Sequence, residues 1–411
     1  MQKMGNIVIG QSGGPTAVIN ASVAGAYVAG KELGAGKVYG MVNGIQGFLE
    51  DNLLDLDEYL ADQEGIELLK RTPAAFLGTC RYKLPKPEGN ETVYEQIFAV
   101  MEKHEITTML YIGGNDSMDT VKMLSDYAAE HGKTHRFVGI PKTIDNDLPV
   151  TDHCPGFGSA AKYIAASIKE IIRDNEAFEG KVKLILVEIM GRHAGWLTGA
   201  AGLAKGTDCT GVDAIYLPER VFDIDAFVAK IEEIARKKSS IVIAVSEGVK
   251  LADGRFVSEY AAESTDVDVF GHKQVAGSCA ALADIVEKRT GIKARVIEPS
   301  LLQRAASHIA SLTDIDEAFA AGYAGVKAAD QGQTGVMITL NRVSDTPYIC
   351  ETAAYDIHAI ANQEKMVPQH FISEDGCQIT EDFLAYLRPL IQGELHPIFK
   401  DGLPVHLVRK K

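Results

Sequence analysis

The stretch "TTMLYIGGNDSMD" (residues 107–119) decides the fold class of this chain. It opens on a mainly apolar run typical of a buried strand, and two glycines then lead into a polar helix start. The same order of apolar run, glycine turn and helix occurs in "NIVIGQSGGPTAVIN" (6–20) and "LILVEIMGRHAG" (184–195). Glycine lets backbone N–H groups approach an anion, and a helix N-terminus adds positive potential. Three such loops together predict an α/β protein that binds phosphate.

Short apolar runs alternate with amphipathic stretches along most of the chain. We expect strands at residues 6–10, 107–113, 136–140, 183–191, 213–218, 240–248, 294–299 and 335–340, and helices at about 116–131, 158–175, 194–204, 223–238, 273–290 and 314–331. Runs rich in valine and isoleucine, separated by helices, predict parallel sheets with both faces covered. The predicted fold class is α/β, with two Rossmann-like three-layer αβα domains, mainly parallel sheets and an active site in the cleft between them.

The length of 411 residues exceeds one typical domain and fits two or three. We expect a first α/β domain at residues 1–150, with a segment that returns to it later in the chain. A second α/β domain is expected at 151–345. Residues 346–411 are less regular in pattern and are interpreted as a C-terminal extension or cap, whose helix within 369–394 serves packing.

Composition and charge exclude several kinds of partner. The formal charge of −15 repels nucleic acid and anionic membrane surfaces. No apolar run approaches the length of a membrane span, and the apolar run at the N-terminus is too short for a signal peptide. The six cysteines stand singly, without metal-ligand or redox spacing, which predicts reduced thiols in a cytoplasmic protein.

The glycine loops match neither of the two commonest nucleotide motifs. The first strand is not followed by G-x-G-x-x-G, and no G-x-x-x-x-G-K-[ST] occurs. A dinucleotide-dependent dehydrogenase and a P-loop enzyme are therefore disfavoured.

Phosphoryl transfer needs anchored phosphates, a divalent metal on hard oxygen ligands, a base, and cations for the developing charge. The stretch "PKTIDND" (141–147) supplies Asp145 and Asp147, and "GGNDS" (113–117) supplies Asn115 and Asp116. The candidate cations are Arg81, Lys83, Lys142, Arg192, Arg295 and Arg304. The competing interpretation of the two aspartates is a turn or helix cap, and that of each arginine is a solvated face or an ion pair.

These motifs together resemble the phosphofructokinase family, whose members move a phosphoryl group onto the 1-hydroxyl of fructose 6-phosphate. The resemblance covers at least residues 5–340. Its motifs keep the family's order: "SGGPTAVIN" (12–20), "LGTCR" (77–81), "GGNDS" (113–117), "PKTIDND" (141–147), "EIMGR" (188–192), "SEG" (246–248) and "ARVIEPSLLQR" (294–304). The resemblance implies Mg²⁺ as the cofactor. It also implies a homodimer or homotetramer, because the family's sugar-phosphate site is shared between subunits.

The family's roles carry over to the residues that match. The resemblance assigns the donor phosphates to Gly13, Gly14, Arg81 and Lys83. It assigns the sugar phosphate to Thr143, Met190, Gly191, Glu247, Arg295 and Arg304, and one such arginine can come from a neighbouring subunit. It makes Asp145 the base on the sugar hydroxyl and places Arg192 near the transferring group. The candidate metal ligands are Asn115, where most members carry aspartate, and Asp147.

Two positions bear on the phosphoryl donor. Members that use ATP usually carry glycine where this chain has Asp116 and Lys142, whereas members that use pyrophosphate fill both positions as here. A carboxylate at 116 stands where the α-phosphate of a nucleotide must pass. At roughly 4 Å and an effective dielectric near 20, two like unit charges repel by about 4 kcal/mol, or about three decades in affinity. An ammonium at 142 stabilises the departing phosphate.

The favoured function is therefore the reversible, pyrophosphate-dependent phosphorylation of fructose 6-phosphate to fructose 1,6-bisphosphate, with Asp145 as base. The alternative enzyme is an ATP-dependent 6-phosphofructokinase. A lipid or NAD kinase is disfavoured, since "EIMGR" and "ARVIEPSLLQR" resemble a sugar-phosphate site. A non-catalytic regulatory subunit that binds sugar phosphates is the alternative from a different class. Such a chain should have lost its base, and Asp145 is present.

Overall fold

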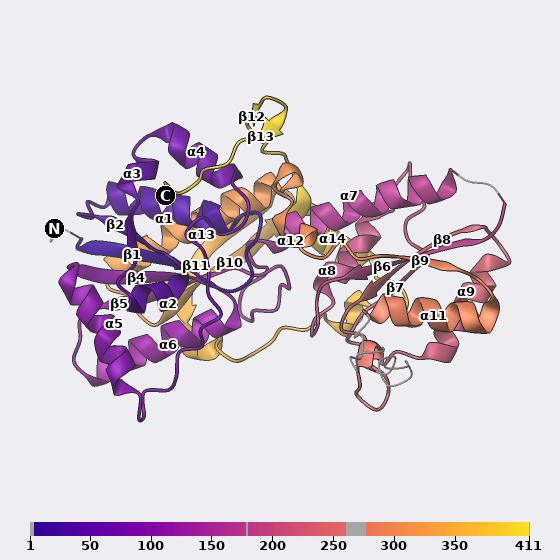
Figure 1. Cartoon of the computed structure of the whole chain (residues 1–411), viewed down its shortest axis with the longest axis horizontal. Helices are drawn as coiled ribbons and strands as arrows, with labels where there is room; N and C mark the ends of the chain where they lie inside the picture. Colours follow the sequence, from indigo (N-terminus) through magenta and orange to yellow (C-terminus); the bar gives the residue numbers. More distant parts are fainter. Residues whose placement is uncertain (1–3, 178–179, 260–276, 411) are drawn as a thin grey trace, which may run out of the picture.

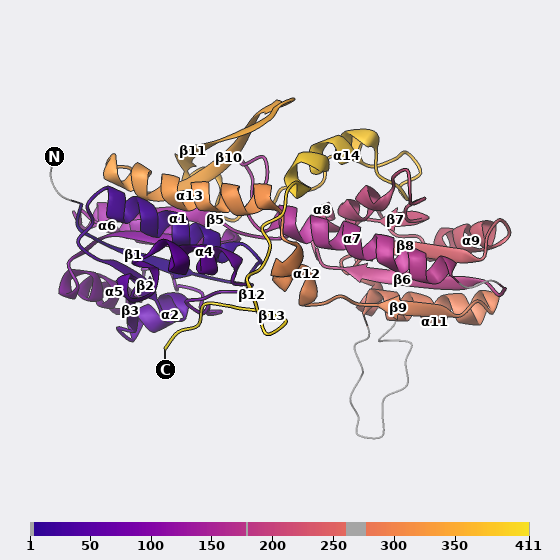
Figure 2. The same cartoon turned by 90° about the horizontal axis from the view of Figure 1, so that it is seen from above.

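The computed structural model describes residues 4–177, 180–259 and 277–410, and these residues build two β-sheets with helices on both faces (Figures 1 and 2). The larger sheet has the strand order β11-β10-β5-β4-β1-β2-β3. Its strands are β1 (Asn6–Gln11), β2 (Val38–Met41), β3 (Leu53–Asp55), β4 (Ile106–Gly113), β5 (Arg136–Pro141), β10 (Val336–Asp345) and β11 (Tyr348–Asp356). All pairs are parallel except the edge pairs β2–β3 and β10–β11.

The smaller sheet has the order β7-β8-β6-β9 and is entirely parallel. Its strands are β6 (Lys183–Ile189), β7 (Ala214–Tyr216), β8 (Ser240–Ser246) and β9 (Ala294–Ile297). A separate short hairpin joins β12 (Phe399–Lys400) and β13 (Leu403–Pro404) near the C-terminus. All eight strands expected from the sequence are present, and the predicted α/β class with mainly parallel sheets is confirmed.

Alternation along each central strand explains why both faces of the larger sheet are covered. Ile7 and Ile9 of β1 pack on one face, and Val8 between them packs on the other. The first face is covered by α1 (Ile19–Glu32), α4 (Gln63–Arg71) and α13 (Leu312–Asp330). The second face is covered by α2 (Gly44–Leu49), α5 (Glu91–Lys103) and α6 (Asn115–Glu130). The short helix α3 (Asp57–Leu60) precedes α4.

The smaller sheet follows the same rule. Ile185 and Val187 of β6 face α7 (Phe157–Glu176), α8 (Trp196–Gly199) and α14 (Glu381–Leu387), whereas Leu184 and Leu186 face α9 (Ile224–Ala235) and α11 (Ser278–Thr290). The short helix α12 (Leu302–Ala305) lies between the two sheets in both views (Figures 1 and 2). No described helix is long and apolar enough to span a membrane.

Most expected helices are observed within a few residues of their predicted ends. The helix expected at 194–204 is instead the short α8 followed by a 3-10 helix, Ala200–Ala204. The helix expected at 273–290 begins in α11 at Ser278, and residues 273–276 lie outside the described residues.

Strands β10 and β11 join the larger sheet although they come late in the chain. Residues Val336 and Met337 of β10 pair with Val138 and Gly139 of β5. The chain therefore returns to the first sheet after building the second. The strands fall on either side of the boundary expected at residue 345, and the division of the chain into domains at 150 and 345 stays a prediction.

Helices α1 and α13 pack with their backbones in close contact. A β-carbon at Gly25 would lie 2.0 Å from the carbonyl oxygen of Phe319, and one at Gly322 would lie 2.0 Å from that of Ser22. Each helix therefore places a glycine against the other helix's backbone. Helix α13 also packs against β5, which ends one residue before Lys142.

Candidate active site

Five strands from the two sheets end around one pocket of about 960 Å³. The loops after β1, β4 and β5 of the larger sheet line it, and so do Met190 after β6 and Glu247 after β8 of the smaller sheet. Ligands of open α/β sheets bind at the carboxyl ends of parallel strands, because the loops there converge and the helices that follow point their N-termini at the site. The topology therefore makes this pocket the candidate active site.

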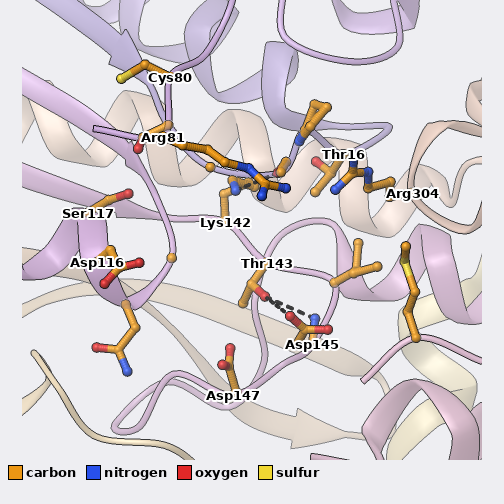
Figure 3. Close-up of a pocket in the computed structure, with 18 of the residues that line it drawn as sticks. Thr16, Cys80, Arg81, Asp116, Ser117, Lys142, Thr143, Asp145, Asp147 and Arg304 are labelled. Carbon is orange, nitrogen blue, oxygen red and sulfur yellow. Dashed lines mark hydrogen bonds between the residues drawn. The ribbon is translucent and has the colours of Figure 1, made fainter. Parts of the chain in front are cut away.

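The pocket gathers most of the residues predicted from the sequence. These are Gly13, Gly14, Arg81, Lys83, Asn115, Asp116, Lys142, Thr143, Asp145, Asp147, Met190, Glu247 and Arg304. Figure 3 shows the side chains of Arg81, Lys142 and Arg304 on one side and the carboxylates of Asp116, Asp145 and Asp147 on the other. One side of the pocket is suited to phosphate groups, and the other is suited to a proton or a metal ion.

Lys142 follows the last residue of β5 and is almost completely buried. Its Nζ donates a hydrogen bond of 2.7 Å to the carbonyl oxygen of Gly14. Burial is the main cause that lowers the pKa of the Lys142 ammonium to about 8. The charge of Asp145 raises this pKa, and the charge of Arg304 lowers it further. The ammonium is thus poorly solvated, a state that favours binding of an anion.

Asp145 lies three residues further along the same loop. Its backbone N–H donates to Thr143 Oγ1 at 3.0 Å. Burial, and then the charges of Asp147 and Glu247, raise the pKa of Asp145 to about 6. Burial also raises the pKa of Asp147, and Glu364 adds to that shift. A carboxylate with a pKa near 6 is ionised at neutral pH yet basic enough to accept a proton from a hydroxyl.

The glycine loop after β1 lies against the cations. Gly13 has φ +72°, a conformation that favours glycine, and its β-carbon would lie 3.4 Å from Lys142 Nζ. A β-carbon at Gly14 would lie only 2.5 Å from Arg304 Nη1. Glycine at these positions lets two positive side chains approach the backbone of the loop.

Three predicted residues do not line the pocket. Gly191 follows Met190 with φ +129°, and its N–H donates to Glu247 Oε1 at 3.3 Å, so it shapes the wall from behind. Arg192 and Arg295 are exposed, the latter on the edge strand β9. The single chain does not bring these two arginines into the pocket.

The pocket also contains residues that were not predicted from the sequence. Thr16, Cys80 and Ser117 belong to motifs quoted above, and Tyr82 directly follows one of them. Asn362 and Glu364 come from the C-terminal region, which was expected to be a cap and carries no motif there. Glu364 also contacts the ring nitrogen Nδ1 of His193 at 3.2 Å, and His193 comes from the loop after β6.

Asn115 is held by the same C-terminal loop. Its Nδ2 donates to the carbonyl oxygen of Gln363 at 2.8 Å, and its Oδ1 accepts from the N–H of Asn362 at 2.7 Å. Both polar atoms of the amide therefore have backbone partners, whereas Asp116 and Asp147 offer the pocket carboxylate oxygens, which are stronger ligands for a hard cation.

Within the described ranges, one group with metal-ligating geometry is found, formed by His153, Glu317 and Cys350. His153 contacts Asp152 at 2.8 Å and Glu317 at 2.6 Å through its two ring nitrogens. Burial lowers the pKa of His153, but the two carboxylates raise it to about 9 overall. The imidazole is therefore protonated at neutral pH in this arrangement, and each ring N–H faces a carboxylate.

A buried lysine, a base with a raised pKa, glycine loops and hard-oxygen carboxylates define a phosphoryl-transfer site between two α/β sheets. The family model for phosphofructokinase matches residues 6–297. The chain belongs to the phosphofructokinase family.

The similarity to known proteins extends over nearly the whole chain. A pyrophosphate–fructose 6-phosphate 1-phosphotransferase of Methylococcus capsulatus is 44% identical, over 97% of this chain and 94% of its own. One of Halomonas elongata is 42% identical over the same shares. The crystal structure of a pyrophosphate-dependent phosphofructokinase from Nitrosospira multiformis aligns with a TM-score of 0.88 at 39% identity, covering 99% of this chain and 98% of that one.

Proposed function

We propose that the protein transfers a phosphoryl group between pyrophosphate and the 1-hydroxyl of fructose 6-phosphate, in both directions. The observation that carries the proposal is that Lys142 and Asp116 line the same pocket. Lys142 is buried against the glycine loop, and Asp116 stands in the first turn of α6. The close similarity to enzymes named for this reaction supports the same donor and acceptor.

In the proposed reaction, O1 of the sugar attacks the nearer phosphorus of pyrophosphate, and the bridging P–O bond breaks. Asp145 accepts the hydroxyl proton, and inorganic phosphate leaves. Lys142, with Arg81 and Arg304, stabilises the charge that develops on the transferring and leaving groups. The nearly equal phosphoryl potentials of pyrophosphate and the bisphosphate make the reaction reversible.

Within this proposal, Thr143, Met190 and Glu247 contact the sugar phosphate, and Gly13, Gly14 and Lys83 contact the donor. Gly191 shapes the sugar site from behind. Arg192 and Arg295, exposed in the single chain, complete a site only through a change of conformation or a neighbouring subunit. We also propose that the protein forms a homodimer or homotetramer and that it is located in the cytoplasm.

The carboxylates of Asp116 and Asp147 fit a Mg²⁺ ion, because hard oxygens are its preferred ligands and both residues line the pocket. Asn115 is the weaker ligand in this proposal, since its amide already binds residues 362 and 363. When bound, Mg²⁺ would neutralise negative charge on the donor phosphates.

The test is to run the reaction both ways with purified protein and Mg²⁺. Pyrophosphate and fructose 6-phosphate should give fructose 1,6-bisphosphate and phosphate in equal amounts, and the two products should regenerate pyrophosphate. Absence of turnover in either direction, with folded protein, would refute the proposal.

A further inference from the structure

The loop that carries Asp145 and Asp147 is held by residues outside the family-matched range of 6–297. The residue between the two aspartates, Asn146, is completely buried and has φ +55°. Asparagine is among the few residues other than glycine that adopt the left-handed conformation, and a completely buried asparagine is held there by the groups that bond its side chain. The groups that fix Asn146 thus control how the carboxylates on either side are directed.

The side-chain amide of Asn146 has a partner at each end. Its Oδ1 accepts the backbone N–H of Cys154 at 3.0 Å, within the same loop region. Its Nδ2 donates to the hydroxyl of Tyr386 at 2.9 Å. Tyr386 belongs to α14, 240 residues later in the chain.

The Tyr386 hydroxyl joins two points of the same loop. It accepts from Asn146 and donates its own proton to the carbonyl oxygen of Asp152 at 2.9 Å. Burial raises the pKa of this hydroxyl well above its usual value, so it remains a donor at any working pH. The two bonds use one donor and one acceptor, as a tyrosine hydroxyl requires.

The ring of Tyr386 is itself immobilised. The Arg342 guanidinium lies over it at 4.7 Å from the ring centroid, and Arg342 Nη2 donates to the Tyr386 carbonyl oxygen at 3.0 Å. The Trp196 ring packs at 5.5 Å. These contacts fix the ring of Tyr386 and therefore the position of its hydroxyl.

A second residue from the C-terminal region, Lys365, bonds Asp147, the residue that follows Asn146. The backbone N–H of Lys365 donates to the carbonyl oxygen of Asp147 at 2.6 Å. Lys365 Nζ donates to the carbonyl oxygens of Thr151 and Asp152. Residues 365 and 386 thus hold the loop at Asn146, at Asp147 and at residues 151 and 152.

We propose that Tyr386 is a positioning residue for phosphoryl transfer, acting through Asn146 on the directions of the Asp145 and Asp147 carboxylates. This inference rests on the proposed function for its kinetic consequence. Tyr386 does not line the pocket, so it acts on the rate of the chemical step rather than on substrate binding.

The first variant is Tyr386→Phe, which keeps the ring packing and removes only the hydroxyl. We expect kcat to fall at least tenfold, with KM for both substrates and the calorimetric affinity for fructose 6-phosphate within threefold of wild type. The matched control is Tyr27→Phe on α1, which keeps a buried ring and removes a hydroxyl that donates to Asp57 of α3 at 2.8 Å. The control should keep kcat within twofold.

A double-mutant cycle shows whether Tyr386 acts through Asn146. Asn146→Gly tolerates the left-handed turn but lacks the amide, and we expect it to lower kcat to a similar degree. The double variant should lose no more than the slower single variant. Independent, multiplicative losses, or an unchanged kcat in folded Tyr386→Phe, would overturn the proposal.

Hydrogen–deuterium exchange tests the positioning without using turnover. Peptides spanning residues 141–154 should exchange at least tenfold faster in Tyr386→Phe than in Tyr27→Phe. Unchanged exchange would overturn the positioning role. An inactive wild-type protein whose loop exchange still depends on Tyr386 would instead refute only the proposed function.

Discussion

The Lys142 ammonium donates a 2.7 Å hydrogen bond to the Gly14 carbonyl oxygen, so the end of β5 is tied to the glycine loop after β1. The two strands are not neighbours, because β4 lies between them. The bond therefore crosses the carboxyl edge of the sheet, where the donor phosphates are proposed to bind. The positive charge of Lys142 therefore lies against the loop that is proposed to contact the anionic phosphoryl donor.

We predict that Lys142→Met lowers kcat/KM for pyrophosphate by about 10²–10³-fold, the usual loss when one donor to a developing charge is removed. Fructose 6-phosphate affinity should change little. Steady-state kinetics combined with sugar-phosphate calorimetry separates the two effects. A loss confined to fructose 6-phosphate binding would contradict the donor role of Lys142.

Asp145→Asn is predicted to lower kcat by about 10²–10⁴-fold, because the variant has no base for the sugar hydroxyl. The affinity for fructose 6-phosphate should stay within a few-fold, as measured by calorimetry. Retention of wild-type turnover would refute the base assignment.

The same substitution should make the unliganded protein more stable at neutral pH. The folded-state pKa of Asp145 is raised to about 6, so its contribution to stability is full below the unfolded value near 4 and is lost as pH rises through 6. Removing the buried carboxylate should recover on the order of 2–3 kcal/mol above pH 7 and much less at pH 4. Urea unfolding at both pH values measures this difference, and an equal effect at both would contradict it.

The pH dependence of kcat/KM should be bell-shaped. Asp145 must be ionised, so the rate should fall below about pH 6, and Lys142 must be protonated, so it should fall above about pH 8. In the Lys142→Met variant the residual activity should lose the alkaline limb and keep the acidic one. An alkaline limb that persists unchanged would assign it to another group.

The helix contact behind the site gives a prediction about stability. Gly322→Ala would place a β-carbon 2.0 Å from the Ser22 carbonyl oxygen and should lower the free energy of unfolding by about 1–3 kcal/mol. Gly206→Ala is the control, since its β-carbon would meet only the Asp208 side chain at 3.4 Å. Equal stability of the two variants in urea titrations would contradict the close α1–α13 contact.

Local patterns predicted most of the central fold. Buried parallel strands such as β1 and β4 are continuous apolar runs followed by glycine, a strong and local signal. Strands β2 and β3 were missed because neither forms an apolar run: β2 (VYGM) contains a glycine, and β3 (LLD) is only half-buried and ends on an aspartate. Strand β11 was missed because it forms an edge, and its exposed side chains do not produce an apolar run.

The site was predictable where strand ends carry its residues. The order of the motifs was enough to predict that Lys142, Asp145 and Arg304 belong to one site. Asn362 and Glu364 reach the same pocket from more than 200 residues after Asp147, by a tertiary contact that no local pattern encodes. The partners of Asn115 and Asn146 in the C-terminal region were unpredictable for the same reason.

The most direct test of the central claim is the ratio of kcat/KM for pyrophosphate to that for ATP, measured with Mg²⁺ and saturating fructose 6-phosphate. The account predicts a ratio of about 10³ or more for wild type, from the repulsion between Asp116 and a nucleotide's α-phosphate. It also predicts that Asp116→Gly lowers this ratio by admitting ATP. A wild-type ratio near or below one would contradict the assignment of pyrophosphate as donor.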